Sequence, residues 1–264
     1  MEIALRQPDI AEVFERVLVP SIFDRYARDL IERARPIGPS DRVLDLGCGT
    51  GIVARLLRAR LGGAARITGL DVSPPMIAKA RSLAPELDWR EGNAMALPFA
   101  DHAFDLVLSQ QMFQFVPDRA AALREARRVL APGGRLLAST WRPRAFQPLH
   151  DGLGKVAEHH LGTSNDKRWS LDGEALRALL VEAGFVDVQI TTVTLIEQHR
   201  EFPVRMSAMA AGFDLSSLSE TERERRLTAV ETDSAPVIGG FAVEGYFAAP
   251  STTNIAVATA PGAA

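Results

Sequence analysis

The chain begins with a helical hydrophobic pattern and then changes to short apolar runs that alternate with helical segments. Residues 9–35 carry apolar side chains at helical spacing, and Pro20-Ser21 divides this stretch into two predicted helices. Beyond residue 41, short apolar runs predict strands at 42–46, 66–70, 87–90, 104–109 and 134–141. Helical patterns lie between these runs at 51–61, 74–83 and 119–130.

This alternation predicts an α/β protein with a doubly wound, mostly parallel sheet and helices on both faces. Right-handed crossovers then bring the carboxyl ends of the strands, and the loops that follow them, to one edge of the sheet. Farther along, the pattern predicts helices at 172–183 (ended by Gly184), 203–212 and 219–231, and strands at 186–196 and 254–259.

We interpret residues 1–264 as a single domain with four parts. Residues 1–38 form a helical lid and residues 39–142 form the core that binds a ligand. The segments 143–171 and 197–240 interrupt the regular alternation, so we expect them to be insertions on the substrate side rather than a separate domain.

The most informative stretch is Val43-Leu-Asp-Leu-Gly-Cys-Gly-Thr-Gly51, at a predicted turn from strand to helix. Glycine lets the chain turn tightly and lets a ligand approach the backbone. The helix that follows directs its free N–H groups and its positive dipole end toward that ligand. A dinucleotide site requires Gly or Ala where this chain has Ile52, which disfavours a nicotinamide or flavin cofactor.

Two loops after neighbouring predicted strands add polar groups at the same edge of the sheet. Asp71 follows the second strand, where a carboxylate can accept hydrogen bonds from both hydroxyls of a ribose; its alternative role is to cap the helix that starts at Pro74. Asn93-Ala-Met95 follows the third strand and can frame an adenine, although Asn in a loop is also common turn chemistry.

With these features the chain resembles the class I methyltransferases that use S-adenosylmethionine, particularly their small-molecule branch in ubiquinone and menaquinone biosynthesis. Residues 43–51, 69–81, 92–107 and 127–136 are similar, in order, to four motifs of that family. The resemblance spans roughly residues 10–200 and implies a Rossmann-like sheet of seven strands whose last strand is antiparallel.

The resemblance also implies roles for individual residues. Asp45 and the loop Gly47, Gly49, Thr50 and Gly51 would hold the methionine part of S-adenosylmethionine, and Asp71 would hold its ribose. The adenine would lie among Val72, Met76, Asn93, Ala94 and Met95. Further cofactor contacts would come from Ser109, Gln110 and, on the N-terminal lid, Phe23 and Tyr26. S-Adenosylhomocysteine would be the product of the cofactor.

The acceptor side offers fewer signals. We expect a substrate pocket lined by five side chains: Phe113, Gln114, Phe115, Trp141 and His150. Glutamine cannot act as a general base at neutral pH, so Gln111 and Gln114 are weak catalytic candidates. His150 is the remaining candidate base, and its alternative is an ordinary loop histidine. His159 and His160 are adjacent on a predicted helix and point apart, so no metal site is predicted.

Composition and charge restrict the classes of molecule that we expect the chain to bind. The net charge of −3 gives no general attraction for nucleic acid or for an anionic membrane, and no apolar run predicts a membrane span or a signal peptide. We therefore expect a cytoplasmic enzyme that methylates a small, partly apolar molecule, with oxygen preferred over nitrogen or carbon as the methylated atom. Such an enzyme can form a homodimer. The alternatives are a dinucleotide-dependent oxidoreductase and a catalytically silent protein that binds S-adenosylmethionine.

Overall fold

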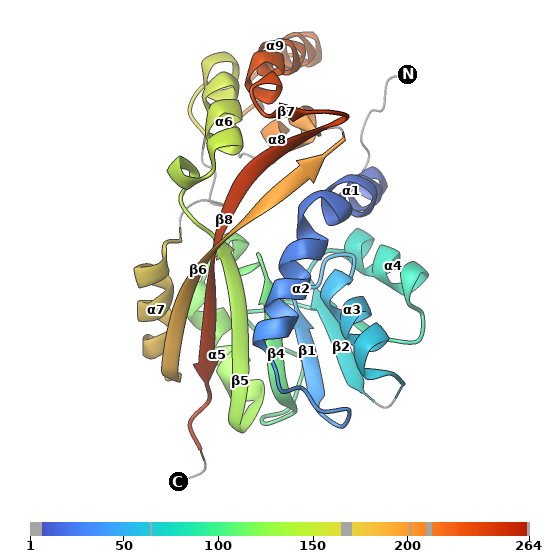
Figure 1. Ribbon diagram of the computed structural model, residues 1–264, viewed down its shortest axis with the longest axis vertical. Helices are drawn as coiled ribbons and strands as arrows, with labels where there is room; N and C mark the ends of the chain where they lie inside the picture. The colour runs from blue at the N-terminus through green and yellow to red at the C-terminus, as the bar shows by residue number, and fades with distance from the viewer. Residues whose placement is uncertain (1–6, 64, 165–170, 201, 210–212, 263–264) are drawn as a thin grey trace.

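A computed structural model describes residues 7–63, 65–164, 171–200, 202–209 and 213–262, and Figure 1 shows the arrangement of its elements. The sheet follows the order β3-β2-β1-β4-β5-β8-β6, with β7 paired to β8 outside this path. Its strands are β1 (Arg42–Leu46), β2 (Arg66–Asp71), β3 (Asp88–Glu91), β4 (Phe104–Gln110), β5 (Leu130–Trp141), β6 (Val186–His199), β7 (Ala242–Val243) and β8 (Tyr246–Thr259).

The pairing confirms a mostly parallel sheet with an antiparallel last strand. The pairs among β1 to β5 are parallel, whereas β8 runs antiparallel to both of its neighbours, β5 and β6. β7 is a two-residue strand beyond the seven that we expected. β8 begins at Tyr246 and not at residue 254, because the ladder with β6 continues as far as the pair His199↔Phe247.

Two groups of helices cover the sheet on opposite faces. The buried side chains of α2 (Asp24–Arg33), α3 (Ile52–Leu61) and α4 (Pro74–Leu83) share one core cluster, which includes Val43 and Leu108 of the strands. Those of α5 (Arg119–Val129) and α7 (Gly173–Glu182) share another, which includes Leu44 and Val107. Adjacent strand residues thus point to opposite faces, as expected for a sheet buried on both sides.

A third group of helices packs over the far end of β6 and β8, at the top of Figure 1. It consists of α6 (Pro148–Leu161), α8 (Val204–Met209) and α9 (Glu220–Gly239). The expected helix 203–212 is described only as far as residue 209, and residues 165–170, 201 and 210–212 of the two expected insertions lie outside the described residues. Short 3₁₀ turns occur as η2 (Phe113–Phe115) and η3 (Arg144–Phe146).

The N-terminal segment Gln7–Arg33, here called the N-terminal arm, corrects the expected break at Pro20. It runs without interruption from α1 (Gln7–Val13) through the π-helix η1 (Phe14–Phe23) into α2. Proline lacks an N–H and normally ends a helix, but in η1 the bonding partner shifts: the N–H of Asp24 donates to the carbonyl of Val19, five residues back. Ser21 does not cap a second helix; its hydroxyl donates to the carbonyl of Val17.

Among the described residues, no helix is both long enough and apolar enough to span a bilayer.

Candidate functional site

The glycine loop between β1 and α3 has the backbone shape of a ligand cradle. Gly47, Gly49 and Gly51 all have positive φ angles, of 72°, 54° and 85°. A Cβ at Gly47 would lie 2.2 Å from the Cγ of Met112, so no larger residue fits there without a shift. The N–H groups of residues 47 and 48 both donate to the carbonyl of Leu70, which fixes the loop against the end of β2.

Asp45 lies beneath this loop as a buried carboxylate. It is 1% exposed, and its Oδ2 accepts a hydrogen bond of 3.0 Å from the N–H of Ala54 in the first turn of α3. Burial raises the pKa of Asp45 to about 7; the hydrogen bond from Ala54 opposes this rise and the nearby charge of Asp71 adds to it. A protonated Asp45 can donate a hydrogen bond as well as accept one.

Asp71 connects the glycine loop to the loop after β2. Its Oδ2 accepts the N–H of Gly49 at 2.8 Å, and its Oδ1 accepts the N–H of Ser73 at 2.9 Å. Burial raises the pKa of Asp71, and the backbone hydrogen bonds partly offset that effect. Each carboxylate oxygen keeps a second lone pair, so these bonds leave Asp71 able to accept ribose hydroxyls. Its neighbour Val72 is 73% exposed, and Met76 is half-buried.

The loop between β3 and β4 begins beside Asp71, since the N–H of Gly92 donates to the carbonyl of that residue at 3.0 Å. The Oδ1 of Asn93 accepts the N–H of Met95 at 2.9 Å, so Asn93 performs the turn chemistry that was its alternative role, and this N–H is already bonded. Ala94 and Met95 pack partly buried against the core.

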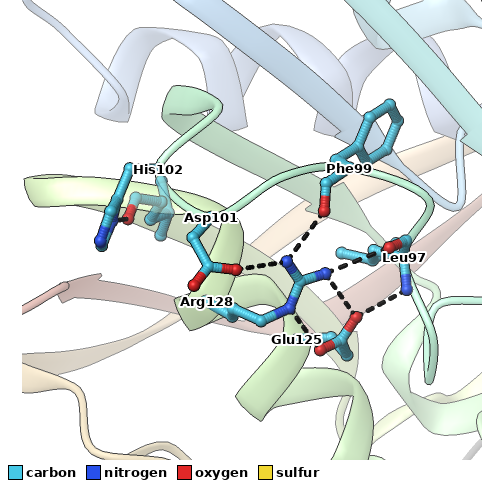
Figure 2. A network of polar contacts seen from close by, with 7 residues as sticks. Leu97, Phe99, Asp101, His102, Glu125 and Arg128 are labelled. Atoms are coloured by element: carbon cyan, nitrogen blue, oxygen red, sulfur yellow. Dashed lines mark hydrogen bonds and ion pairs between the residues drawn. The ribbon is translucent and has the colours of Figure 1, made fainter.

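The rest of this loop is fixed to α5 by the polar network of Figure 2. Arg128 donates to the carbonyls of Leu97 and Phe99 and to the carboxylates of Asp101 and Glu125. These interactions and its ion pairs raise the pKa of Arg128. Nothing in the sequence pattern singled out Arg128 or Glu125, although both lie on the predicted helix 119–130.

The last residues of β4 and those that follow it lie between the glycine loop and β8. Ser109 is fully buried, and the amide of Gln110 donates to the carbonyl of Phe23 in the N-terminal arm. Gln111 has a left-handed backbone, with φ 55°, and its amide donates to Oγ1 of Thr253 on β8 at 2.9 Å. A non-glycine residue in this conformation is typical of functional sites. Gln114 is fully buried beside Gln111.

Two of the expected pocket aromatics, Phe113 and Phe115, differ in exposure. Phe113 is fully buried within the core cluster of α5 and α7, where it packs as an ordinary core residue. Phe115 is 55% exposed on the surface. The sequence placed both rings after the fourth strand, but the 3₁₀ turn η2 sends them in different directions.

The N-terminal arm covers the glycine loop through residues that the sequence analysis did not single out. The ring of Phe14 lies 3.7 Å from the position of a Cβ on Gly49. Glu15 accepts the hydroxyl of Thr50 at 2.6 Å and pairs with Arg55 at 2.7 Å. The hydroxyl of Thr50 is thus directed to the arm.

A string of aromatic rings continues from Phe14 along the arm. Phe14 stacks on Phe23 with 4.7 Å between centroids, Phe23 lies 6.4 Å from Trp141, and Trp141 meets Tyr26 edge-on at 5.2 Å. Tyr26 is 2% exposed and its hydroxyl donates to the carbonyl of Ser251 on β8. Burial raises the pKa of Tyr26 to about 12. Tyr26 thus packs against Trp141 and β8, and Phe14 is a ring beside the glycine loop.

His150, on the first turn of α6, lies against a buried carboxylate. Its Nε2 is 3.2 Å from Oε1 of Glu197 on β6, and the Nε2 of His199 is 2.9 Å from Oε2 of the same residue. Burial alone would raise the pKa of Glu197, but the two histidines outweigh burial and lower it to about 2. Among the described residues, no cluster of His, Cys, Asp and Glu forms a metal site.

Glu197 and His199 could have been found in the sequence. Residues 195, 197 and 199 lie on one face of a strand, because side chains two positions apart point the same way. A carboxylate and an imidazole at such inward-facing positions are unusual. We ended that predicted strand at residue 196, which placed both side chains in the following segment.

Several buried polar atoms near the carboxyl ends of β4 and β5 have no hydrogen-bond partner within the described structure. They are the hydroxyls of Ser109, Ser139, Thr140 and Ser251 and the Oε1 of Gln114. Buried polar atoms in folded proteins normally have partners, so such a group of unsatisfied atoms is typical of a place that water or a ligand completes. Together with the left-handed glycines and Asp71, this fits a polar ligand at the edge of the sheet.

Comparison with known proteins agrees with this geometry. Residues 44–138 match the model of a family described as "Methyltransferase domain". The chain is 36% identical over 180 residues to the demethylmenaquinone methyltransferase of Thermus thermophilus, covering 61% of this chain and 81% of that protein. It is 31% identical over 225 residues to the ubiquinone/menaquinone biosynthesis C-methyltransferase of Xanthomonas oryzae, covering 70% and 89%.

The chain is a class I methyltransferase that uses S-adenosylmethionine. Its fold is similar to that of the YcgJ protein of Bacillus subtilis, with a TM-score of 0.59 at 18% identity over 90% of this chain and 100% of that one. The expected family, fold class and cofactor are confirmed.

Proposed function

We propose that this methyltransferase modifies a small, partly apolar molecule that carries an ionisable hydroxyl, with oxygen preferred over nitrogen or carbon as the methylated atom. The observation that carries the proposal is the contact between His150 and the buried carboxylate of Glu197. An alcohol, phenol or enol becomes a good nucleophile when it loses its proton, and a histidine held by a carboxylate is suited to accept that proton.

The cofactor side of the proposal uses the residues at the ends of β1, β2 and β3. Asp45, Gly47, Gly49 and Gly51 would hold the methionine part of S-adenosylmethionine, and Asp71 its ribose. Val72, Met76, Ala94 and Met95 would flank the adenine, while Asn93 would shape that loop. The exposed apolar side chain of Val72 supports this role, since a flat ring can cover it.

Bound S-adenosylmethionine supplies a methyl group on a positively charged sulfur, which leaves with the bonding electron pair. The chain itself has to align the acceptor and exclude water. The N-terminal arm is suited to exclude water, because Glu15 ties it to Thr50 and Arg55 directly over the glycine loop. We propose that this arm is the lid of the site.

The acceptor would lie along the aromatic string between the glycine loop and His150. The rings of Phe23, Trp141 and Tyr26 offer apolar contacts, and the hydroxyl proton of the acceptor would pass to the imidazole of His150. The Glu197 carboxylate would orient that imidazole toward the acceptor. Gln111 and Gln114 would then contribute hydrogen bonds rather than proton transfer.

Two measurements test the proposed activity. Calorimetry should show tight binding of S-adenosylhomocysteine and none of NADH; binding of NADH alone would support the oxidoreductase alternative. A panel of phenols, enols, acids and amines should yield a product that has gained one methyl group, and ¹³C NMR with labelled methyl would identify the atom that carries it. Sedimentation of the pure protein would test the expected homodimer.

The role of His150 has its own test. His150→Ala should lower kcat by roughly 10²-fold or more, the usual contribution of a general base, while binding of S-adenosylhomocysteine is unchanged. His159→Ala is the matched control, because His159 is exposed on the same helix. An unchanged kcat in His150→Ala would refute proton transfer by this residue. If the wild-type protein and both variants bind the cofactor but show no turnover, the alternative of a catalytically silent binding protein is favoured.

A further inference from the structure

The loop that we propose to contact adenine is attached to α5 by an arginine and a glutamate of that helix. Arg128 lies near the end of α5, on the helix beneath the loop between β3 and β4 (Figure 2). Its Nη1 donates to the carbonyl of Phe99 at 2.8 Å and to Asp101 at 2.7 Å, and its Nη2 donates to the carbonyl of Leu97 at 3.1 Å. One guanidinium therefore reaches three residues of the loop.

Glu125, one turn earlier on α5, completes the attachment. It binds Arg128 in a bidentate pair, with Nε to Oε1 at 2.7 Å and Nη2 to Oε2 at 2.8 Å. Its Oε2 also accepts the N–H of Leu97 at 2.7 Å. The two side chains thus satisfy both the N–H and the carbonyl of Leu97, a pairing that normally requires a neighbouring strand.

The end of the loop is fixed by the backbone of the same helix and its extension. His102 has a left-handed backbone with φ 60°; its N–H donates to the carbonyl of Arg128, and its Nδ1 lies 2.9 Å from the carbonyl of Leu130. At the beginning of the loop, Gly92 is bonded to Asp71. The stretch from 92 to 102 therefore has a fixed start, a fixed end and a fixed middle.

We infer that Arg128, with Glu125, is a positioning residue for adenine recognition: it sets the height and direction of the Asn93–Met95 segment and so determines how tightly the purine is read. Arg128 does not contact the cofactor in this role; it acts through the loop. A rigid loop loses less conformational entropy on binding and keeps its contacts aligned with the base. The inference rests on the proposed placement of adenine at this loop.

The test compares two ligands that differ only at the purine. S-Adenosylhomocysteine and S-inosylhomocysteine, in which the 6-amino group is replaced by oxygen, are titrated by calorimetry into the full chain and into Arg128→Lys. We expect Arg128→Lys to lower the affinity for S-adenosylhomocysteine about tenfold, and the preference for adenine to decrease by a similar factor. Arg124→Lys is the control, since Arg124 is exposed on the same helix, and it should leave both affinities unchanged.

A purely structural role of Arg128 would lower the amount of folded protein or weaken both ligands equally, and an unchanged ratio of the two affinities in Arg128→Lys would overturn the inference. Equal affinity of the wild-type protein for the two ligands would overturn it too. Glu125→Gln provides a milder change if the arginine variant does not fold, and the same loss of preference is expected. Failure of the wild-type protein to bind S-adenosylhomocysteine would instead contradict the proposed function, and the inference with it.

Discussion

The two halves of the site that we propose, one for the cofactor and one for the acceptor, differ in how far apart in the sequence their contacting residues lie. In the cofactor half, formed by the loops after β1, β2 and β3, Asp71 binds Gly49 across a separation of 22 residues. In the proposed acceptor half, formed by the Tyr26 end of the N-terminal arm, the residues after β4, α6 and the far parts of β6 and β8, Tyr26 binds Ser251 across 225 residues and Gln111 binds Thr253 across 142. The cofactor half is assembled from consecutive loops, and the acceptor half from distant segments.

This difference explains why a short sequence motif predicts the cofactor site, whereas no short motif predicts the acceptor site. Consecutive parallel strands bring their carboxyl ends together whatever the rest of the chain does, so the same loops always meet. The acceptor half depends on where an antiparallel strand and three helices pack, and each residue there has a partner that no short pattern specifies. Substitutions in the two halves should therefore have separable effects.

The largest expected effect is on folding in the cofactor half. Gly51→Ala should lower the free energy of unfolding by about 2–5 kcal/mol, because a left-handed alanine costs about 1–2 kcal/mol and overpacking adds about 1–3. The overpacking arises since the new Cβ would lie 2.2 Å from the ring of Trp89. Gly133→Ala is the matched control: Gly133 has φ 76° with open space around it, so it should show only the conformational cost in urea denaturation. Equal losses in both variants would exclude the packing contribution.

The second effect is a dependence of the free energy of unfolding on pH, which should differ between the two halves. The pKa of Asp45 is about 7 in the folded state and 3.8 in the reference state, so the folded protein binds more protons between these values and loses stability as pH rises from about 4 to 7. The loss is on the order of 4 kcal/mol at most, at about 1.4 kcal/mol for each unit of pKa. Asp45→Asn should remove the contribution of Asp45 to this slope in denaturation curves recorded at pH 4 to 7, whereas the contribution of Asp71, whose pKa burial also raises, should remain.

Glu197, in the acceptor half, should behave in the opposite way. Its folded pKa of about 2 lies below the reference value of 4.5, so its ion pairs stabilise the fold above pH 4.5, and that contribution is lost as pH falls from 4.5 toward 2. Glu197→Gln should flatten this acid limb and leave the slope between pH 4 and 7 intact. If Asp45→Asn and Glu197→Gln changed the stability in the same pH range, the two carboxylates would not titrate independently.

The third effect concerns affinity. Asp71→Ala should weaken the binding of S-adenosylhomocysteine by about 1.5–3 kcal/mol, the usual loss when a charged hydrogen-bond partner is removed. Part of the loss comes from the glycine loop, because the N–H of Gly49 loses its acceptor. Calorimetry with Asp88→Ala, an exposed carboxylate on β3, serves as the control. Unchanged affinity in Asp71→Ala would exclude the ribose role.

The smallest effect is expected in the acceptor half. Tyr26→Phe removes the hydrogen bond to the carbonyl of Ser251 and should lower the free energy of unfolding by about 0.5–1.5 kcal/mol. Because Tyr26 packs against Trp141 and not against the glycine loop, the affinity for S-adenosylhomocysteine should not change. A weaker affinity in this variant would support the direct cofactor contact that the family resemblance implies.

Most of the fold was predictable because it follows from local chemistry. The alternation of apolar runs with helices predicted β1 to β5 and α3 to α5 within a few residues, except that β5 begins at Leu130 rather than at residue 134. The continuous helix through Pro20 was not predictable, because a helical pattern with an internal proline favours a break unless tertiary packing supports a π-helix.

The sequence by itself determined the glycine loop, Asp71 and the shared edge at which the parallel strands end, since each depends on backbone sterics and on the handedness of consecutive crossovers. Only the tertiary structure decided that Glu197 meets His150, that Phe14 covers Gly49 and that Arg128 holds the loop after β3. These contacts join segments whose spacing in the sequence carries no periodic signal, and they exist because the packing of the arm, of α5 and of the β6–β8 pair leaves those side chains facing one another.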